Sequence, residues 1–503
     1  MQGLQATAVT IEVNATRGVR FVLVGLPDNA VKESHERILA AIENSGFTFP
    51  TRQITINLSP ADIRKEGSGY DLPMAIGILA TEDKVNTSQL GKYMMVGELS
   101  LDGSLVPIRG ALPVAIKARE MGFEGLFVPE GNIREAAVVN KLKVYGVKHI
   151  TQVVNHLNGT ALLEPTVVDT RGEFYARQYE FDYDFADVKG QEHVKRAMEV
   201  AAAGGHNIIM IGPPGSGKSM LAKRMPSILP PLSLQESLET TQIHSVAGTL
   251  PAGCSLMAQR PYRSPHHTIS QVALVGGGTN PQPGEISLAH NGILFLDELP
   301  EFQRSVLEVL RQPLEDRVIN VSRAKYSVTF PCSFMFVASM NPCPCGYYNH
   351  PTKACCCTPG QIVRYLNKIS GPLLDRIDLQ IELSPVPFSD LSKMEPGEPS
   401  EKIRERVIRA RKIQEERFRD YALIHSNAQM TEKMLGQYCV LDSQTTEVLR
   451  EAMIRLNLSA RAYSRILKVA RTIADLEEKE NIEFAHVAEA VGYRTLDRSS
   501  WGE

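Results

Sequence analysis

Residues 212–219 read Gly212-Pro213-Pro214-Gly215-Ser216-Gly217-Lys218-Ser219, a stretch that matches the phosphate-binding loop pattern in full. An apolar strand is predicted directly before this loop and a helix directly after it, which is the context that the pattern requires. Glycines let backbone N–H groups turn toward a β-phosphate, Lys218 neutralises charge on the β- and γ-phosphates, and the Ser219 hydroxyl can bind Mg²⁺. The stretch therefore predicts an ATP and Mg²⁺ site in a parallel α/β domain.

A second acidic element follows further along the chain. It reads Ile293-Leu294-Phe295-Leu296-Asp297-Glu298, which is a buried type of strand that ends in two carboxylates. We predict that Asp297 holds Mg²⁺ and that Glu298 polarises the attacking water, because hydrolysis needs an aligned nucleophile as well as charge neutralisation. An acidic strand end that only caps the next helix is the alternative.

A third apolar strand, over 334–338, is followed by Ser339-Met340-Asn341. Asn341 stands where a polar side chain could orient water against the γ-phosphate, and its place resembles the sensor-1 position of AAA+ ATPases. An asparagine after a strand is otherwise a common turn former. Because it comes third in this order of motifs, we predict a functional role.

Two arginines resemble further catalytic positions of AAA+ proteins. Arg376, within Gly371-Pro372-Leu373-Leu374-Asp375-Arg376-Ile377-Asp378, resembles the arginine finger of magnesium chelatases and minichromosome maintenance ATPases, which reaches a neighbouring subunit's γ-phosphate. Arg461, within Leu458-Ser459-Ala460-Arg461-Ala462, opens a predicted lid helix and resembles sensor 2. The resemblance implies a ring of subunits, whereas a surface ion pair is the alternative for each arginine.

Length and charge limit the classes of protein. The chain has 503 residues, more than one hydrophobic core usually supports, so we expect two or three domains. A formal net charge of −3 argues against a uniformly basic nucleic-acid wrapper but leaves room for a basic channel. The sequence has no apolar run of about 18 residues and no signal pattern, which predicts a cytoplasmic protein without a membrane partner.

Periodicity and composition predict a multidomain α/β protein with four segments. They are a mixed α+β domain over 1–165, a linker over 166–186, a parallel α/β ATPase core over 187–388 and a helical lid over 389–503. Strands are expected in the first domain over 8–13, 21–24 and 54–58, with a helix over 29–45 between them. No periodicity is seen in the linker.

Several blocks together resemble one family. They are Arg263-Ser264-Pro265-His266-His267-Thr268, Leu274-Val275-Gly276-Gly277-Gly278 and Pro283-Gly284-Glu285-Ile286-Ser287-Leu288-Ala289-His290-Asn291-Gly292. A further block near the start is Val24-Gly25-Leu26-Pro27-Asp28-Asn29-Ala30-Val31-Lys32-Glu33-Ser34. The resemblance of these blocks to the Mg-chelatase-like ComM/YifB family covers nearly the whole chain. It implies a homohexamer that drives branch migration of DNA junctions in homologous recombination, notably in natural transformation. A protein-remodelling ring and a magnesium chelatase subunit are the alternatives.

The first domain resembles the Lon protease fold. The matching blocks are Lys65-Glu66-Gly67-Ser68-Gly69-Tyr70-Asp71-Leu72-Pro73 and Gly97-Glu98-Leu99-Ser100-Leu101-Asp102-Gly103. A Ser–Lys protease needs a serine beside a desolvated lysine. The resemblance places Gly69 or Tyr70 where Lon has its nucleophile and Leu112 where Lon has its lysine, which implies a scaffold without proteolytic activity.

One protease hypothesis stays open at this point, in which Ser68 acts with Lys65 or Lys117. Members of the family usually begin with one further short strand, so the resemblance also implies that Met1 is a truncated or misassigned start.

Five of the eight cysteines are crowded into residues 343–357. In a reducing compartment such crowding favours metal ligation over disulfides. The predicted ligands of a tetrahedral Zn²⁺ site are Cys343, Cys345, Cys355 and Cys357. Cys356 would be spare, because relatives commonly carry Cys-x-Cys in the second half. His350 is an alternative ligand, and a set of free thiols is the alternative to a metal site.

The predicted DNA contacts come from loops. Residues 318–330 read as a β-hairpin with Arg323 and Lys325 near its tip, which resembles the pre-sensor-1 hairpin that lines pores in this clade. Such pores contact mostly phosphate, so we predict that both residues bind branched or single-stranded DNA without sequence preference. Residues 263–268 could also face the channel. Contacts between subunits are the alternative for both segments.

Overall fold

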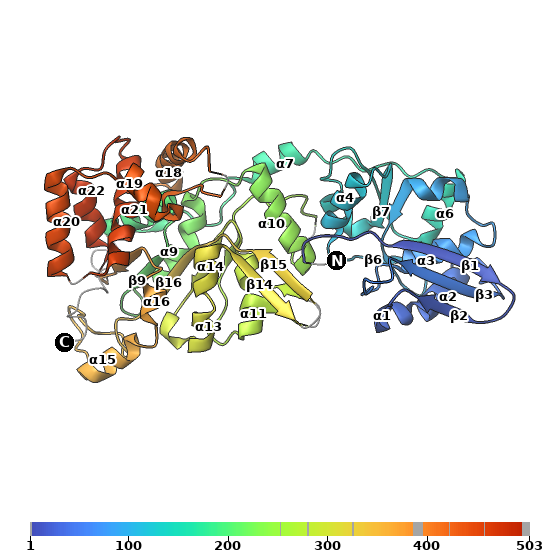
Figure 1. Ribbon diagram of the computed structural model, residues 1–503, viewed down its shortest axis with the longest axis horizontal. Helices are drawn as coiled ribbons and strands as arrows, with labels where there is room; N and C mark the ends of the chain where they lie inside the picture. The colour runs from blue at the N-terminus through green and yellow to red at the C-terminus, as the bar shows by residue number, and fades with distance from the viewer. Residues whose placement is uncertain are drawn as a thin grey trace. The chain divides into compact units, whose positions relative to one another are not determined.

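The computed structural model describes residues 3–251, 253–278, 281–323, 326–385, 396–421, 423–456 and 458–494. The chain forms two compact units, and Figure 1 shows its elements coloured along the sequence. The first unit holds residues 1–176 and 234–257, and the second holds 177–233 and 258–503. Residues 234–257 thus group with the first unit, although they lie inside the range predicted for the ATPase core. The four predicted domain boundaries stay a prediction.

Two three-stranded sheets and a short hairpin form the strands of the first unit's described residues. One sheet has the order β1 (Thr10–Thr16), β3 (Gln53–Ser59), β2 (Phe21–Val24), with β1 antiparallel and β2 parallel to β3. The other is parallel, in the order β4 (Tyr93–Met95), β7 (Gly125–Pro129), β8 (Lys143–Val147). β5 (Glu98–Leu99) pairs with β6 (Leu105–Val106). Alternate residues of β3 are buried, as the period of two predicts for a strand with one core face.

The first unit also contains helices, several of which contact these strands. The helices are α1 (Asn29–Lys32), α2 (Ser34–Asn44), α3 (Asp71–Ala80), α4 (Ala111–Glu120), α5 (Ile133–Ala136), α6 (Ile150–Asn158), α7 (Thr170–Arg177) and α10 (Leu234–Ala247), with the 3₁₀ helices η1 (Thr87–Lys92) and η2 (Glu130–Asn132). For example, α3 contacts β1 and α4 contacts β7. The helix expected over 29–45 is interrupted at Glu33. The Ser34 hydroxyl donates to the Val31 carbonyl at 2.6 Å there, and such a bond competes with regular helix bonding.

The helix α7 lies within the segment predicted to be an irregular linker. Phe174 on this helix is buried, and Glu173 forms an ion pair with Arg134 and accepts a hydrogen bond from Ser255 at 2.9 Å. Tertiary contacts therefore stabilise a helix that has no clear apolar period of its own, because packing routinely outweighs intrinsic propensity.

A five-stranded parallel sheet is the centre of the second unit. Its order is β10 (Tyr262–Arg263), β13 (Ile293–Leu296), β16 (Met335–Met340), β9 (Ile208–Ile211), β17 (Leu379–Glu382). Every residue of β9, β13 and β16 is buried, which explains why their sequences are continuous apolar runs. The predicted parallel α/β core is confirmed.

Short helices and two hairpins surround this sheet. The helices are α8 (Glu192–Gly204), α9 (Lys218–Arg224), α11 (Gln271–Val275), α12 (Glu285–Leu288), α13 (Arg304–Glu308), α14 (Arg311–Asp316), α15 (Pro359–Leu366) and α16 (Gly371–Leu374), with η3 (Phe185–Asp187), η4 (Met225–Ile228) and η5 (Leu299–Glu301). β11 (Gly276–Gly277) pairs with β12 (Gln282–Pro283). β14 (Val318–Arg323) pairs antiparallel with β15 (Tyr326–Pro331), so the expected hairpin is present.

The C-terminal part of the second unit is helical, as expected. It contains α18 (Ser400–Arg417), α19 (Glu432–Tyr438), α20 (Ser443–Arg455), α21 (Ala460–Leu476) and α22 (Phe484–Gly492), with η6 (Asn427–Gln429). On α21, Ile466, Ala470 and Ile473 are buried, the spacing of one apolar helix face. Across the described ranges, no helix is long and apolar enough to cross a membrane.

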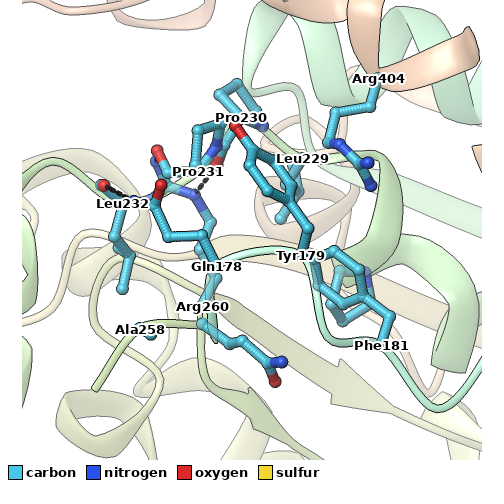
Figure 2. Close-up of a pocket in the computed structure, with 12 residues that line it drawn as sticks. Gln178, Tyr179, Phe181, Leu229, Pro230, Pro231, Leu232, Ala258, Arg260 and Arg404 are labelled. Carbon is cyan, nitrogen blue, oxygen red and sulfur yellow. Dashed lines mark hydrogen bonds between the residues drawn. The ribbon is translucent and has the colours of Figure 1, made fainter. Parts of the chain in front are cut away.

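The cavity in Figure 2 lies among Pro230, Leu232 and the stacked side chains of Arg404, Tyr179 and Phe181. The Arg404 guanidinium carbon lies 4.8 Å from the centre of the Tyr179 ring and 5.5 Å from that of Phe181. The volume of about 10 Å³ suits about one water molecule, so this cavity is too small for a nucleotide.

Candidate nucleotide site

The loop over 212–217 joins β9 to the first residue of α9. The Gly212 amide donates to the Met340 carbonyl of β16 at 3.1 Å, which ties the start of the loop to the neighbouring strand. Gly215 and Gly217 have φ angles of +79° and +89°, a backbone conformation that residues with a Cβ rarely adopt. A glycine-rich turn of this kind at the N-terminus of a helix is the arrangement in which backbone amides bind a phosphate.

Lys218 lies over its own loop. Its Nζ donates to the carbonyls of Gly212 and Pro213 at 2.7 and 2.9 Å and lies 3.3 Å from Asn341 Oδ1. Burial lowers the pKa of Lys218, and the charges of Asp297 and Glu298 oppose that shift. The ammonium thus lies among oxygen atoms at the carboxyl end of the sheet, where a phosphate group would be its natural partner.

Asp297 joins three elements of the site. Its Oδ2 accepts a hydrogen bond from Ser219 Oγ at 2.6 Å, and its Oδ1 accepts one from the hydroxyl of Ser339 on β16. The Glu298 amide also donates to Asp297 Oδ1, at 3.0 Å. The two predicted Mg²⁺ residues, Ser219 and Asp297, therefore lie in contact. Both offer oxygen atoms, the kind of ligand that Mg²⁺ prefers.

Glu298 stands in the left-handed region, with a φ angle of +52°. Such strain in a non-glycine residue is typical of functional sites. His267 Nδ1 lies 3.7 Å from Glu298 Oε2, and the rings of His266 and His267 are 4.0 Å apart. The carboxylate therefore lies beside residues 263–268, and its charge also acts on Lys218 of the loop.

Arg376 lies at the other end of the same sheet. Strand β17 begins three residues after it and runs parallel to β9, with Leu379 opposite Ile208 and Glu382 opposite Ile211. Asn207, just before β9, donates its side-chain amide to the Arg376 carbonyl at 2.9 Å. The phosphate loop begins only after Ile211, so four strand residues, roughly 13 Å, separate the two positions. Arg376 is therefore too far away to reach the loop of its own chain.

Arg461 is the second residue of α21 and lies beside Arg376. Its Nη1 donates to Asp375 Oδ2 at 2.9 Å, and its side chain is 69% exposed. The structure thus places both predicted catalytic arginines at the amino end of the sheet, whereas Lys218, Asp297 and Asn341 meet at the carboxyl end. The roles of all these residues stay predictions.

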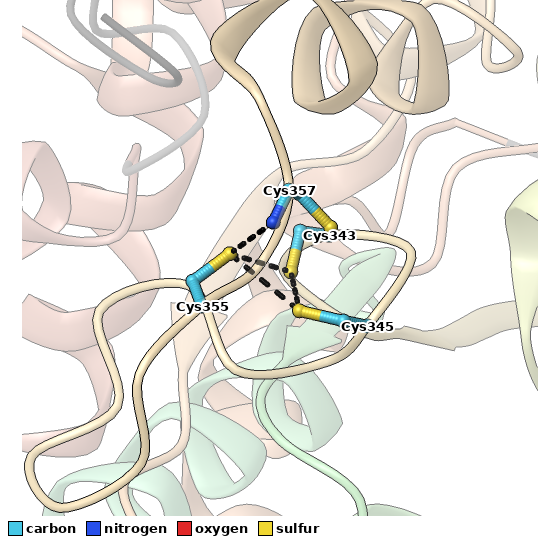
Figure 3. Close-up of side chains that lie close together, drawn as sticks. All are labelled: Cys343, Cys345, Cys355 and Cys357. Carbon is cyan, nitrogen blue, oxygen red and sulfur yellow. Dashed lines mark hydrogen bonds between the residues drawn. The ribbon is translucent and has the colours of Figure 1, made fainter.

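Four thiols meet after Asn341, as Figure 3 shows. The sulfur atoms of Cys343, Cys345, Cys355 and Cys357 all lie within 4.8 Å of one another. The pairs among the first three are 3.3, 3.7 and 3.5 Å apart. Four thiolates about 2.3 Å from a Zn²⁺ ion would lie about 3.8 Å apart, so the residues fit such a site. His350 Nδ1 instead accepts hydrogen bonds from its own loop, and Cys356 is exposed.

The cysteine loop touches the phosphate loop. Gly346 has a φ angle of +83°, and a Cβ there would lie 2.6 Å from Pro214 Cδ. Only a glycine allows this close approach. The thiol cluster and the predicted nucleotide site are therefore parts of one packed region.

Ser68, the serine of the protease hypothesis, has an acidic partner. Its hydroxyl donates to the Glu98 carboxylate, whereas the Lys65 ammonium is buried against the Pro60 carbonyl. Lys117 Nζ lies 3.2 Å from Glu120 Oε2. Among the described residues, neither lysine contacts Ser68, so a Ser–Lys dyad is not assembled here.

Of the predicted DNA contacts, Arg323 is the last residue of β14, and Lys325 lies outside the described residues.

Sequence reasoning assigned no role to two residues that contact the site, Ser339 and Glu315, and it included His267 only within residues 263–268, a segment that could face the channel. Ser339 stands at the end of a strand next to Asp297, and that adjacency was its one available signal. The contact between Glu315 and Arg376 depends on tertiary packing and had no signal in the sequence.

Comparisons with known proteins match nearly the whole chain. The family model described as magnesium chelatase, subunit ChlI, matches residues 184–391, that of subunit ChlI of Mg-chelatase matches 11–132, and the ChlI C-terminal model matches 397–494. YifB of Salmonella typhimurium is 44% identical over 500 residues, which cover 99% of this chain and 96% of that protein. Competence protein ComM of Haemophilus influenzae is 44% identical over 505 residues, with the same shares covered.

A more distant likeness is restricted to one segment. Lon protease 2 of Bacillus subtilis is 31% identical over 157 residues, which cover 28% of this chain and 27% of that protein. The Lon resemblance is thus partial, whereas the other matches extend over the parallel core and the helical C-terminus. The chain belongs to the ComM/YifB family of Mg-chelatase-like AAA+ proteins.

Proposed function

We propose that this chain is the subunit of a hexameric, ATP-driven DNA motor that drives branch migration of recombination intermediates. The AAA+ family supports nucleotide and Mg²⁺ binding. The name of the Haemophilus influenzae relative, a competence protein, supports work on DNA during transformation. An intracellular, cytoplasmic location follows from that task.

The proposed chemistry uses residues at the carboxyl end of the sheet. The β- and γ-phosphates would be held by the Lys218 ammonium and by backbone amides of the loop Gly212-Pro213-Pro214-Gly215-Ser216-Gly217. Asn341 would orient the attacking water. Glu298 would accept a proton from that water. Ser219 and Asp297 would hold Mg²⁺, which when bound neutralises charge on the phosphates.

The position of Arg376 carries the proposal of a ring. Arg376, which resembles an arginine finger, lies about a strand length from the phosphate loop of its own chain. It could therefore stabilise transition-state charge only in a neighbouring subunit. A head-to-tail contact that closes on itself gives every subunit one complete site. Arg461 would take part in the same intersubunit contact, because it lies beside Arg376.

The remaining parts of the proposal concern DNA, zinc and domain layout. Arg323 and Lys325 of the hairpin would contact DNA phosphates without sequence preference. The four clustered thiols would hold one Zn²⁺ ion as a structural site. The proposed layout is a non-proteolytic Lon-like domain over 1–165, a linker over 166–186, the ATPase core over 187–388 and the lid over 389–503.

The test is ATP turnover with and without four-way junction DNA, together with unwinding of labelled three- and four-stranded junctions. We expect junction DNA to stimulate turnover and to be processed, with Lys218→Ala as the inactive control. If junction DNA changes neither quantity while the protein still hydrolyses ATP, the DNA motor is excluded and a protein-remodelling ring becomes the better proposal.

A second candidate is a magnesium chelatase subunit, because the family model that matches residues 184–391 carries that description. ATP-dependent insertion of Mg²⁺ into a porphyrin by the protein with its partner subunits would favour this candidate. Junction processing without any such insertion would exclude it.

A further inference from the structure

Glu315 holds the guanidinium of Arg376 in the second unit. Arg376 Nη2 lies 2.5 Å from Glu315 Oε1, and Arg376 Nη1 donates to the Pro372 carbonyl at 2.6 Å. The Arg376 side chain is only 11% exposed, while that of Glu315 is 56% exposed. The Nε atom of Arg376 is buried without a hydrogen-bond partner in the described chain. The arginine is therefore turned inward, with its charge neutralised by its own chain.

This arrangement conflicts with the role proposed for Arg376. A guanidinium that stabilises phosphate charge in another subunit must be exposed at the surface and must present its N–H groups. Here two of those groups bind Glu315 and Pro372. The ion pair must break, or rotate outward, before Arg376 can meet a phosphate.

The carboxylate that holds Arg376 lies next to the hairpin. Glu315 is on α14, which ends at Asp316, and β14 begins two residues later at Val318. Arg317 lies between α14 and β14, with a φ angle of +56°. Its guanidinium donates to the Ser333 hydroxyl at 2.9 Å, and its carbonyl accepts a hydrogen bond from the Cys332 amide at 2.8 Å. Arg317 thus links α14 to the base of the hairpin, because it precedes β14 directly and bonds to the two residues that follow β15. Since α14 also contacts β14, a displacement of the hairpin that reaches its base would also displace Glu315.

A groove of about 510 Å³ connects the same parts. Glu315 and Asp316 of α14, Ile319 and Asn320 of β14, and Arg376 all line it. The open volume gives the Arg376 side chain room to swing once its partner is released. The groove also holds a matched control, because Glu308 pairs with Arg311 at 3.0 Å and makes no ion pair with Arg376.

We propose that Glu315 is a positioning residue that restrains Arg376 until the hairpin moves, so that DNA contact at the hairpin frees the arginine for the neighbouring subunit. This inference rests on the proposed ATP-driven DNA motor. It adds a physical reason why turnover would depend on DNA, since α14 contacts the hairpin and, through Glu315, also binds Arg376.

The first test measures Arg376 directly and needs no ATP hydrolysis. The full-length protein, without nucleotide, is treated with phenylglyoxal, and modification of the peptide that carries Arg376 is measured by mass spectrometry. Glu315→Gln and Glu315→Ala should raise that modification roughly three- to ten-fold, because the arginine loses its charged partner. Glu308→Gln should leave it unchanged. Equal modification in the parent protein and both Glu315 variants would overturn the proposal.

The second test measures the consequence for turnover. Without DNA, Glu315→Gln should hydrolyse ATP roughly three- to ten-fold faster than the parent, at unchanged KM, and the stimulation by junction DNA should shrink by the same factor. The double variant Glu315→Gln/Arg376→Ala should match Arg376→Ala, which a loss of general stability would not produce. Slower or unchanged turnover in Glu315→Gln would contradict the restraint.

The two tests separate this inference from the function on which it rests. If the parent turns over no more ATP than Lys218→Ala, the proposed motor fails, whereas the phenylglyoxal result still decides whether Glu315 restrains Arg376.

Discussion

The two ends of the five-stranded sheet differ in how complete they are. At the carboxyl end, Lys218 contacts Asn341 and Ser219 contacts Asp297, so the groups predicted for phosphate and Mg²⁺ converge within one chain. At the amino end, Arg376 is bound to Glu315 of its own chain. The carboxyl end is preorganised for a ligand, whereas in the proposed ring the amino end would act on a second subunit. Catalysis should therefore depend on assembly, although nucleotide binding should not.

The largest expected effect comes from the carboxyl end. Lys218→Ala removes the ammonium beside the phosphates, so both nucleotide binding and hydrolysis should be lost, with turnover at least about 1000-fold lower. Equilibrium binding of a fluorescent ATP analogue and steady-state turnover check this. Normal binding of the analogue by the variant would mean that the loop is not the nucleotide site.

Arg376→Ala should separate binding from hydrolysis. Because Arg376 is distant from its own loop, the variant should bind the ATP analogue like the parent, while turnover falls roughly 1000-fold, as for arginine fingers in related chemistry. Lys368→Ala, which removes an exposed cation paired with Glu301, is the matched control. If Arg376→Ala weakens binding as strongly as Lys218→Ala does, the contrast between the two ends is wrong.

Asp378→Asn should destabilise the amino end. Burial by itself would raise the pKa of Asp378, but Arg465 and His206 lower it below its usual range. The Asp378 side chain is 1% exposed and binds Arg465 at 2.8 Å, so removal of its charge should cost about 3–5 kcal/mol in the free energy of unfolding at pH 7.

The pH dependence of that loss follows from the sign of the shift. A carboxylate with a lowered pKa in the folded state stabilises the protein above its unfolded pKa, and this stabilisation disappears as the pH falls. Urea unfolding should therefore show the gap between parent and variant closing below about pH 4. Asp375→Asn, at an exposed pair, should cost less than about 1 kcal/mol. A gap that widens in acid would contradict this assignment.

The smallest effect is expected at the cysteine loop beside the carboxyl end. Cys343→Ser should lower bound zinc from about one ion per chain and lower the Tm by several degrees, because a structural metal ion stabilises the fold that it binds. Elemental analysis and thermal unfolding check both quantities. Cys356→Ser, at the exposed neighbour outside the cluster, should change neither. If the parent protein contains no zinc and both variants have the same Tm, the cluster is a set of free thiols and not a metal site.

The central sheet could be predicted from the sequence because its chemistry is local. Strands β9, β13 and β16 are buried on both faces, so each is a short apolar run, and the segment after each one supplies a polar side chain at the same edge of the sheet. Since parallel strands end on one side, the convergence of Lys218, Asp297 and Asn341 follows from the order of motifs alone.

Other features depend on contacts that no local pattern records. The helix α7 is stabilised by Phe174 and Glu173 through distant partners, and the break at Glu33 arises where a serine hydroxyl competes for a helix carbonyl. The partner of Arg376 could not be predicted for the same reason, because Glu315 is 61 positions earlier in the sequence and only the fold brings the two residues together.

Complementation between two inactive variants tests the central claim most directly. Lys218→Ala and Arg376→Ala subunits, each inactive alone, are mixed in equal amounts and allowed to exchange before ATP turnover is measured. In a random ring, about a quarter of the interfaces join an intact loop to an intact arginine, so turnover should recover to about a quarter of the parent value. A mixture as inactive as its components would show that Arg376 does not complete the site of a neighbouring subunit.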